Sequence, residues 1–351
     1  MFGMTLNTNQ KPKRKNNTMA ANLQIRDIQT GLSQAWHGLT NIVSCITKEN
    51  AGTNYEMETR PLFIEKSDGT KIETDHKQII SLDDELPIGK PVSSGYCLID
   101  NSRIWDMVQD ALLGMSHKIV SVGTVDNRSK GFISVKLDEA FTAASRLTEP
   151  LLNLIWGHGG NISLIARSGF TVTVCENTFN VNLGRKGKDF NMKLKHTKNA
   201  LNRIDNMNEA IQSYAGVVAE FQAAMNSFEA VSCDEENARK IVSGIVTPDT
   251  FERELTVATR TRNNIERMVK LFGHGAGNKG ETLADVFNAA TDYYSHESSG
   301  GDNDRMKQYV SSEFGSGQRM KEVFFDVLSD EDSLATVRTR GEKVMLSIAN
   351  S

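Results

Sequence analysis

The chain changes its hydrophobic period once, near residue 195, and this change is the feature that most constrains its fold. From about residue 53 to residue 183, apolar residues alternate with polar ones or form short β-branched runs, as in β-strands. After Lys195, apolar residues recur every three or four positions almost to the C-terminus, as in amphipathic helices. Segregated patterns of this kind predict an α+β fold, with a sheet-rich N-terminal half and a mostly helical C-terminal half.

The sheet-rich half is predicted to contain two β-hairpins that flank one helix. The stretch RPLFIEKSDGTKIET predicts a hairpin that turns at Asp68 and Gly69, because glycine tolerates the positive φ angles of a tight turn. Residues 118–137 predict a second hairpin with a longer polar loop. Between them, NSRIWDMVQDALLG has helical spacing, with Asn101 or Ser102 as the expected N-cap.

The longest helical stripe is expected over residues 197–231. Eight apolar positions lie on one face of this helix, spaced alternately by three and four. The stripe spans only about three and a half heptads, which favours packing within the chain, but a seam between two copies stays open. The eight positions are Ile204, Met207, Ile211, Tyr214, Val218, Phe221, Met225 and Phe228.

These patterns divide the chain into four regions. Residues 1–22 form a basic tail that we expect to be disordered, and residues 23–195 form the sheet-rich α+β core. Residues 196–335 form a helical region that packs on the core or extends from it, and residues 336–351 form a C-terminal tail.

Composition and simple motifs argue against several classes of protein. The net charge is only −4, so any affinity for nucleic acid must come from local clusters of charge. No apolar stretch has the length of a signal peptide or a membrane span, and the four cysteines form no CxxC pair, so we expect a soluble protein of the reducing cytoplasm. No zinc, calcium, P-loop or dinucleotide motif occurs in a supporting context, and we expect neither a metal nor a cofactor.

Three residue groups have side chains that catalysis could use, and the sequence assigns a catalytic role to none of them. Cys175 follows a strand-like run and is interpreted as a structural thiol, because no helix N-terminus or cationic partner for it can be identified. His158 stands between glycines and is interpreted as a turn residue with an exposed ring. Asp292 and His296 are four residues apart and are interpreted as a surface pair.

Charge is strongly polarised along the chain. Residues 185–203 contain seven basic residues and one acidic residue, residues 253–279 add a second basic cluster, and residues 292–332 are acidic. Basic clusters of this kind suit phosphate backbones, and Phe170, Phe179, Phe190 and Tyr96 are the aromatic residues that could stack on bases. The residues predicted to contact phosphates are Arg167, Arg185, Lys186, Lys188, Lys193, Lys195, Lys198, Arg260 and Arg262.

Several segments in order also resemble a known family. AWHGLT, KPVSSGYCLIDNSRIWDMV, HGGNISLIARSGFTVTVCENTF, LKHTKNALNRI and TLADVFNAATDYYSHES are similar to the phage and plasmid proteins grouped as domain of unknown function 932. The resemblance covers about residues 33–328 and implies an origin in a mobile element, with DNA processing or evasion of host defence as the context. Its motif residues here are His37, Tyr96, His158, Cys175, Asn177, Thr178, His196 and Thr197.

The leading hypothesis is an oligomeric, non-enzymatic protein that binds single-stranded DNA and promotes annealing in recombination or replication. Its annealing part is a fold-level analogy with phage annealing proteins. A second hypothesis is a protein-interaction factor that meets a host protein through its C-terminal helices. A third is an enzyme acting on nucleotides or nucleic acid near His158, Cys175 and Asn177.

Overall fold

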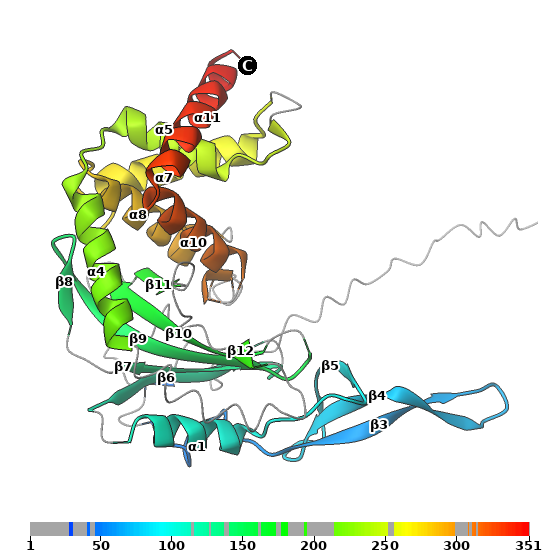
Figure 1. Ribbon diagram of the computed structural model, residues 1–351. Coiled ribbons are helices and arrows are strands. Elements are labelled where there is room, and N and C mark those ends of the chain that lie inside the picture. Colours follow the sequence, from blue (N-terminus) through cyan, green and yellow to red (C-terminus); the bar gives the residue numbers. More distant parts are fainter. Residues whose placement is uncertain are drawn as a thin grey trace, which may run out of the picture.

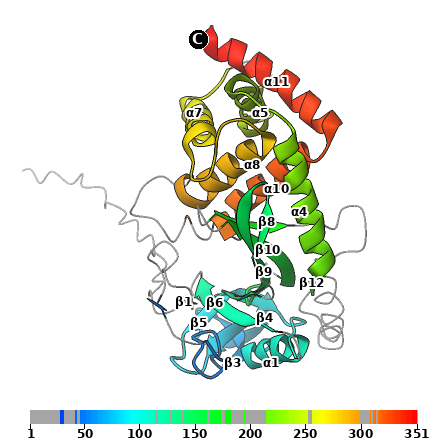
Figure 2. The same ribbon diagram turned by 90° about the vertical axis from the view of Figure 1, so that its left-hand side faces the viewer.

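The structure is a computed structural model in which both sheets and one helix lie at one end of the molecule and the C-terminal helices lie at the other (Figures 1 and 2). A large sheet and a small sheet form the N-terminal half, and helices form the C-terminal half, so the predicted α+β fold is confirmed. The residues described are 28–30, 41–42, 46–113, 116–125, 128–136, 140–160, 163–172, 177–181, 193–194, 214–251, 256–298, 308, 311–313 and 315–350.

The large sheet is antiparallel except for one parallel pair, β1 with β2. The hairpin predicted over residues 118–137 is confirmed as β6 and β7, and β7 pairs in turn with β9. Its strand order is β11-β10-β9-β7-β6-β1-β2, with β8 paired to β9 and β12 paired to β10. The bounds are β1 Ile28–Thr30, β2 Asn41–Ile42, β6 Lys118–Val125, β7 Lys130–Lys136, β8 Phe141–Ala143, β9 Arg146–Gly157, β10 Leu164–Val172, β11 Asn177–Val181 and β12 Lys193–Leu194.

The small sheet contains the other predicted hairpin, which is also confirmed. Its strands are β3 (Met57–Glu65), β4 (Lys71–Ser81) and β5 (Pro87–Ser93), in the order β3-β4-β5. Gly69 adopts the left-handed φ of 82° that the turn requires, and Asp68 Oδ1 accepts a hydrogen bond of 2.8 Å from the Thr70 amide.

Helix α1 (Asn101–Ala111) forms where the sequence predicts it, but its N-cap differs. Asp100 is the N-cap residue, without a side-chain capping bond, so the prediction of Asn101 or Ser102 was wrong. Asn101 is buried, and its Nδ2 donates to the Tyr55 carbonyl at 3.1 Å. The Asn101 side chain therefore bonds to a residue distant in sequence and does not cap the helix as its position alone would predict.

The C-terminal half packs as layered helices against one face of the large sheet, as Figures 1 and 2 show. The predicted helical character of this half is confirmed, and α7 begins at Thr259, after residues 256–258, which have no helical structure. The predicted tail, residues 336–351, contributes most of its length to α11. The bounds are α4 Tyr214–Ala230, α5 Glu235–Val246, α7 Thr259–His274, α8 Leu283–Asp292, the π-helix η3 Tyr293–Glu297, α10 Ser316–Leu328 and α11 Glu331–Ala349.

The described part of the long apolar stripe packs inside the chain. Phe221, Met225 and Phe228 of α4 are buried, and the Phe221 ring stacks on Phe170 of β10 at a centroid distance of 3.9 Å. Phe179 of β11 joins the same cluster through a tilted contact with Phe221 and an edge contact with Phe287. Phe170 and Phe179 are thus core residues that join sheet to helices, and they are not available as platforms for bases. Ile204, Met207, Ile211 and Phe190 lie outside the described residues.

Helix α11 crosses α5 at very close range. A Cβ atom at Gly341 would lie 1.8 Å from the Lys240 carbonyl oxygen, and one at Gly244 would lie 2.2 Å from the Val337 carbonyl oxygen. No side chain fits at either crossing point, so both glycines are required for the two backbones to approach.

Candidate nucleic-acid interface

Helix α7 presents a cationic face to solvent. Arg260, Asn263, Arg267, Lys270 and His274 are all exposed and are spaced by three, four, three and four residues, which places them on one stripe. The opposite face is buried through Ile265, Met268, Val269 and Phe272. The helix can therefore offer one row of mostly basic side chains along about 21 Å without disturbing its own core.

Few carboxylates neutralise this face. Glu266 is ion-paired with Arg239 of α5. Arg267 Nε lies 3.6 Å from Glu297 Oε2, and both side chains are partly exposed, so this contact is weak. Within the described part of the chain, no carboxylate pairs with Arg260 or Lys270. The face also begins at a helix N-terminus with no acidic residue in its first turn, which adds positive potential.

The other predicted phosphate contacts have different surroundings. Arg262 is partly buried, and its Nε donates to the Val257 carbonyl at 3.1 Å, which holds the segment before α7. Arg167 on β10 is also partly buried, and burial lowers its pKa while Glu313 and Glu322 oppose that shift. Lys193 lies on β12, where its backbone is opposite Ile165. Arg185, Lys186, Lys188, Lys195 and Lys198 lie outside the described residues.

His158 is buried, so the prediction of an exposed turn residue was wrong. Its Nε2 lies 2.9 Å from Asn101 Oδ1, which also accepts a hydrogen bond of 3.0 Å from Trp156 Nε1. The Trp156 ring fits directly against Gly131, where a Cβ would approach it to 2.3 Å. These contacts join the ends of β7 and β9 to α1, a structural role that keeps the imidazole from solvent.

The structure describes three of the remaining family-motif residues. Tyr96 is half-buried, its hydroxyl donates to the Gly157 carbonyl at 3.3 Å, and burial raises its pKa. Asn177 and Thr178 lie on β11, where their backbones are opposite Val172 and Thr171. His37, Cys175, His196 and Thr197 lie outside the described residues.

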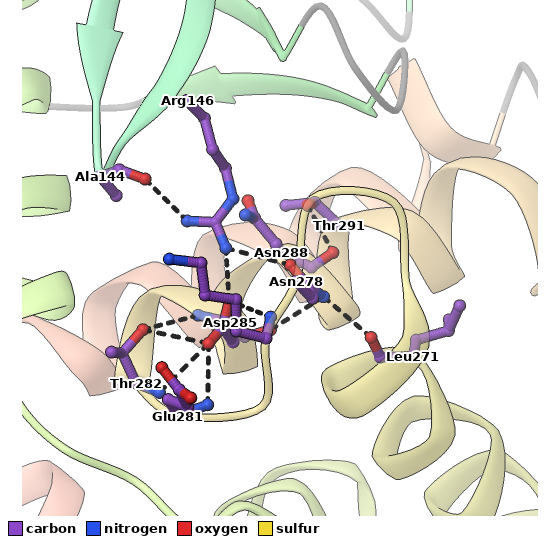
Figure 3. Close-up of polar contacts among 10 residues, drawn as sticks. Ala144, Arg146, Leu271, Asn278, Glu281, Thr282, Asp285, Asn288 and Thr291 are labelled. Carbon is purple, nitrogen blue, oxygen red and sulfur yellow. Dashed lines mark hydrogen bonds and ion pairs between the residues drawn. The ribbon is translucent and has the colours of Figure 1, made fainter.

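A buried charge network joins the sheet to the helical half (Figure 3). Arg146, at the start of β9, forms an ion pair with Asp285 of α8, and both side chains are almost fully buried. The Arg146 guanidinium also donates to the Ala144 carbonyl at 2.9 Å and to Asn278 Oδ1 at 3.2 Å. Asp285 closes a capping box with Thr282 and accepts the Glu281 amide at 2.9 Å. Both members of this pair therefore make further hydrogen bonds, as a buried ion pair requires.

A second buried charge lies in the helical half, at Lys321 of α10. Its side chain is fully buried, with Nζ 2.9 Å from Ser312 Oγ and 3.2 Å from Ser295 Oγ. Burial lowers the pKa of this amine to about 8, and Glu313 and Glu322 partly oppose the shift. Ser295 belongs to the π-helix η3, a rare element. The sequence signal for this centre is a lysine on the apolar stripe of its helix, three residues before Phe324.

The described residues give little support for a metal site, a reactive thiol or a membrane-spanning helix. No group of three or more histidine, cysteine, aspartate or glutamate side chains there could hold a metal ion. Burial raises the pKa of the Cys233 thiol to about 11, which makes it a poor nucleophile near neutral pH. No helix within the same residues has the length and apolar character needed to cross a membrane.

Comparison with known proteins gives one match. The model of a family described as a domain of unknown function, DUF932, matches residues 90–331, which is more than two thirds of the chain. No curated protein and no solved structure matches significantly. The matched region runs from β5 to the start of α11 and so includes the cationic face of α7 and both buried charge networks. The chain belongs to the DUF932 family.

Proposed function

We propose that this protein binds single-stranded DNA, with the cationic face of α7 as part of the binding surface. The observation that supports this is the exposed row of Arg260, Arg267 and Lys270, which one weak carboxylate contact neutralises among the residues that the structure describes. Cationic side chains in a row neutralise successive phosphates and release condensed counterions, which supplies affinity without reading base sequence. The basic residues predicted between 185 and 203 would extend the same kind of surface.

The proposal includes a biological setting. The resemblance to phage and plasmid proteins makes a mobile element the source, and the host cytoplasm the compartment, of a protein that binds and anneals single strands in recombination or replication. Annealing requires the protein to hold a strand by its backbone and leave base edges open. A row of phosphate contacts meets that requirement.

The test is fluorescence anisotropy of a labelled single-stranded oligonucleotide and its duplex across a salt series. The wild type should bind the single strand more tightly, with affinity that falls steeply as salt rises. Reversing charge at Arg260→Glu, Arg267→Glu and Lys270→Glu together should weaken binding at least about tenfold and lower the salt slope by about 2, since each single-strand contact contributes about 0.7.

A matched variant separates a specific surface from general electrostatics. Lys90→Glu, Lys118→Glu and Lys343→Glu make the same change in net charge at exposed lysines outside α7. This control should retain most of the affinity. Equal losses in both triple variants would show that α7 is not the binding surface, and a wild type that binds no oligonucleotide at low salt would remove the proposal in favour of a protein partner.

The basic segment before the helical half has its own test. Glutamate at Lys193, Lys195 and Lys198 together should abolish binding and leave the circular dichroism spectrum unchanged. Undiminished binding by this variant would exclude the segment from the surface and leave α7 as the remaining candidate.

A further inference from the structure

The π-helix η3 holds a tyrosine beside the cationic face of α7. η3 continues α8 directly, and α8 and η3 both pack against α7; Figures 1 and 2 show α7 and α8 side by side. Tyr293, the first residue of η3, is 3% exposed, and its ring meets the Tyr294 ring edge-on at a centroid distance of 5.1 Å. Single π-turns within helices occur frequently at functional sites.

The Tyr293 hydroxyl has no hydrogen-bond partner among the residues that the structure describes. Its oxygen is not fully enclosed, so a ligand can reach it from the surface. A tyrosine hydroxyl in a protein interior usually meets a partner, because leaving it unpaired costs free energy. Tyr293 therefore offers an unused donor to a ligand.

Two arginines of the cationic face lie near this hydroxyl. Burial raises the pKa of Tyr293, and the positive charges of Arg267 and Arg260 lower it, so both guanidinium groups act on the hydroxyl. Within the described part of the chain, Arg260 pairs with no carboxylate. Three donor groups, two of them cationic, thus converge from α7 and η3.

Glu297, at the end of η3, lies at the edge of the same group. Its Oε2 is 3.6 Å from Arg267 Nε, which is too long for a hydrogen bond, and its charge adds to the rise in the pKa of Tyr293. The carboxylate thus lies beside Arg267 without using its donors. Two arginines against one glutamate leave the surroundings of the Tyr293 hydroxyl with a net positive charge.

We propose that Tyr293, Arg260 and Arg267 together form a binding site for one phosphate group. The hydroxyl donates one hydrogen bond to a phosphate oxygen and the guanidinium groups donate to the others, in competition with Glu297. The inference rests on the proposed function for the source of the phosphate, which is the backbone of the bound strand, although the same chemistry would hold a free phosphate compound. Because the hydroxyl is uncharged, its contact adds affinity without adding salt dependence.

The first experiment measures oligonucleotide affinity of Tyr293→Phe by anisotropy across the salt series. The change removes only the hydroxyl and keeps the ring that packs against Tyr294. The dissociation constant should rise about three- to tenfold at every salt concentration with an unchanged salt slope, whereas displaced arginines would lower the slope. Tyr294→Phe is the matched control, because no arginine acts on that hydroxyl among the described residues, and it should bind like the wild type.

Glu297→Gln tests the competition for Arg267. The substitution removes the carboxylate charge at the edge of the site and keeps the shape of the side chain. We expect the oligonucleotide to bind about twofold more tightly than it binds the wild type, as for the loss of a weak exposed pair. Weaker binding by this variant would contradict the competition.

A second readout separates the phosphate site from the proposed function. Tyrosine labelled with ¹³C at Cζ gives the six tyrosines of the chain separate NMR signals, and the signal lost in Tyr293→Phe belongs to Tyr293. Sodium pyrophosphate and the oligonucleotide should each shift this signal, and Arg260→Gln with Arg267→Gln should reduce both shifts. The spectra also establish that each variant is folded.

The two readouts give distinct outcomes. A Tyr293 signal that pyrophosphate shifts, in a protein that binds no oligonucleotide, would support the phosphate site and remove the proposed function. Oligonucleotide binding that Tyr293→Phe leaves undiminished, with a Tyr293 signal that neither ligand shifts, would overturn the phosphate site and leave the proposed function standing. An equal loss of affinity in Tyr294→Phe would also overturn it, because the effect would not depend on the arginines.

Discussion

The Arg146–Asp285 junction and the cationic face of α7 both depend on arginine, but the arginines differ in burial and in the groups that neutralise their charge. Arg146 is enclosed between the sheet and α8, and its charge is balanced by a carboxylate, a carbonyl and an amide oxygen. Arg260 is exposed on α7, at the start of a basic stripe. A charge that the fold already satisfies stabilises architecture, and one that faces water remains available to a ligand. Substitutions should therefore affect stability at the first site and binding at the second.

The largest expected effect is at the junction. Asp285→Ala leaves the Arg146 guanidinium buried without its counter-ion and removes the capping box of α8, so we expect unfolding to become easier by about 3–5 kcal/mol. Glu266→Ala breaks an exposed ion pair with Arg239 and is the matched control, with an expected loss below about 1 kcal/mol. Urea denaturation of both variants measures the difference, and similar losses would contradict the contrast between buried and exposed pairs.

Lys321 gives the next effect, which depends on pH. The pKa of its buried amine is about 8, against 10.5 for a free lysine, so the unfolded chain binds more protons between these values. Below pH 8 the buried, charged amine therefore lowers the free energy of unfolding by its full amount, which is at most on the order of 3 kcal/mol. This loss disappears as the pH rises from 8 toward 10.5. Stability of the wild type relative to Lys321→Met should rise from pH 7 to pH 10, and parallel curves would refute this.

Asp292 provides a smaller effect of the opposite sign. Burial, with a contribution from Glu297, raises the pKa of this carboxyl from 3.8 to about 6. The folded state holds the proton more tightly, so the carboxyl's contribution weakens as pH rises through this range. Asp292→Asn should stabilise the protein at pH 7 by on the order of 1 kcal/mol and give no gain at pH 4. An equal gain at both pH values would point to a cause other than ionisation.

The smallest expected change in stability is at α7. The triple variant Arg260→Glu, Arg267→Glu and Lys270→Glu alters exposed side chains only, and we expect its free energy of unfolding to stay within about 0.5 kcal/mol of the wild type. The same protein should lose oligonucleotide affinity. A large loss of stability here would show that this face supports the fold, and the comparison with the junction would no longer hold.

Local chemistry explains why many elements could be predicted. Gly69 marks the first hairpin turn, and the helical spacing of apolar residues marks α1. The basic cluster over residues 253–279 follows from the order of residues alone. Such signals need no partner from elsewhere in the chain, so they can be recognised in a single sequence without a structure.

The predictions that failed depended on distant partners. Asn101 was expected to cap α1, but its side chain bonds to Tyr55, 46 residues earlier, and accepts from Trp156, 55 residues later. His158 was expected to be exposed, but it lies against Asn101, 57 positions away. Lys321 was not identified at all, because its serine partners come from two separate segments.

The sequence by itself determined the class of fold, the two hairpins with the helix between them, and the basic character of residues 253–279, since hydrophobic period, turn residues and charge spacing act over a few residues. Only the tertiary structure decided which charges are enclosed and which are presented to solvent. Arg146 and Asp285 are 139 residues apart, and the sequence around either residue does not indicate that the other is its partner. Burial depends on how distant elements pack, and that packing determines whether a charged side chain holds the fold together or is free to meet a ligand.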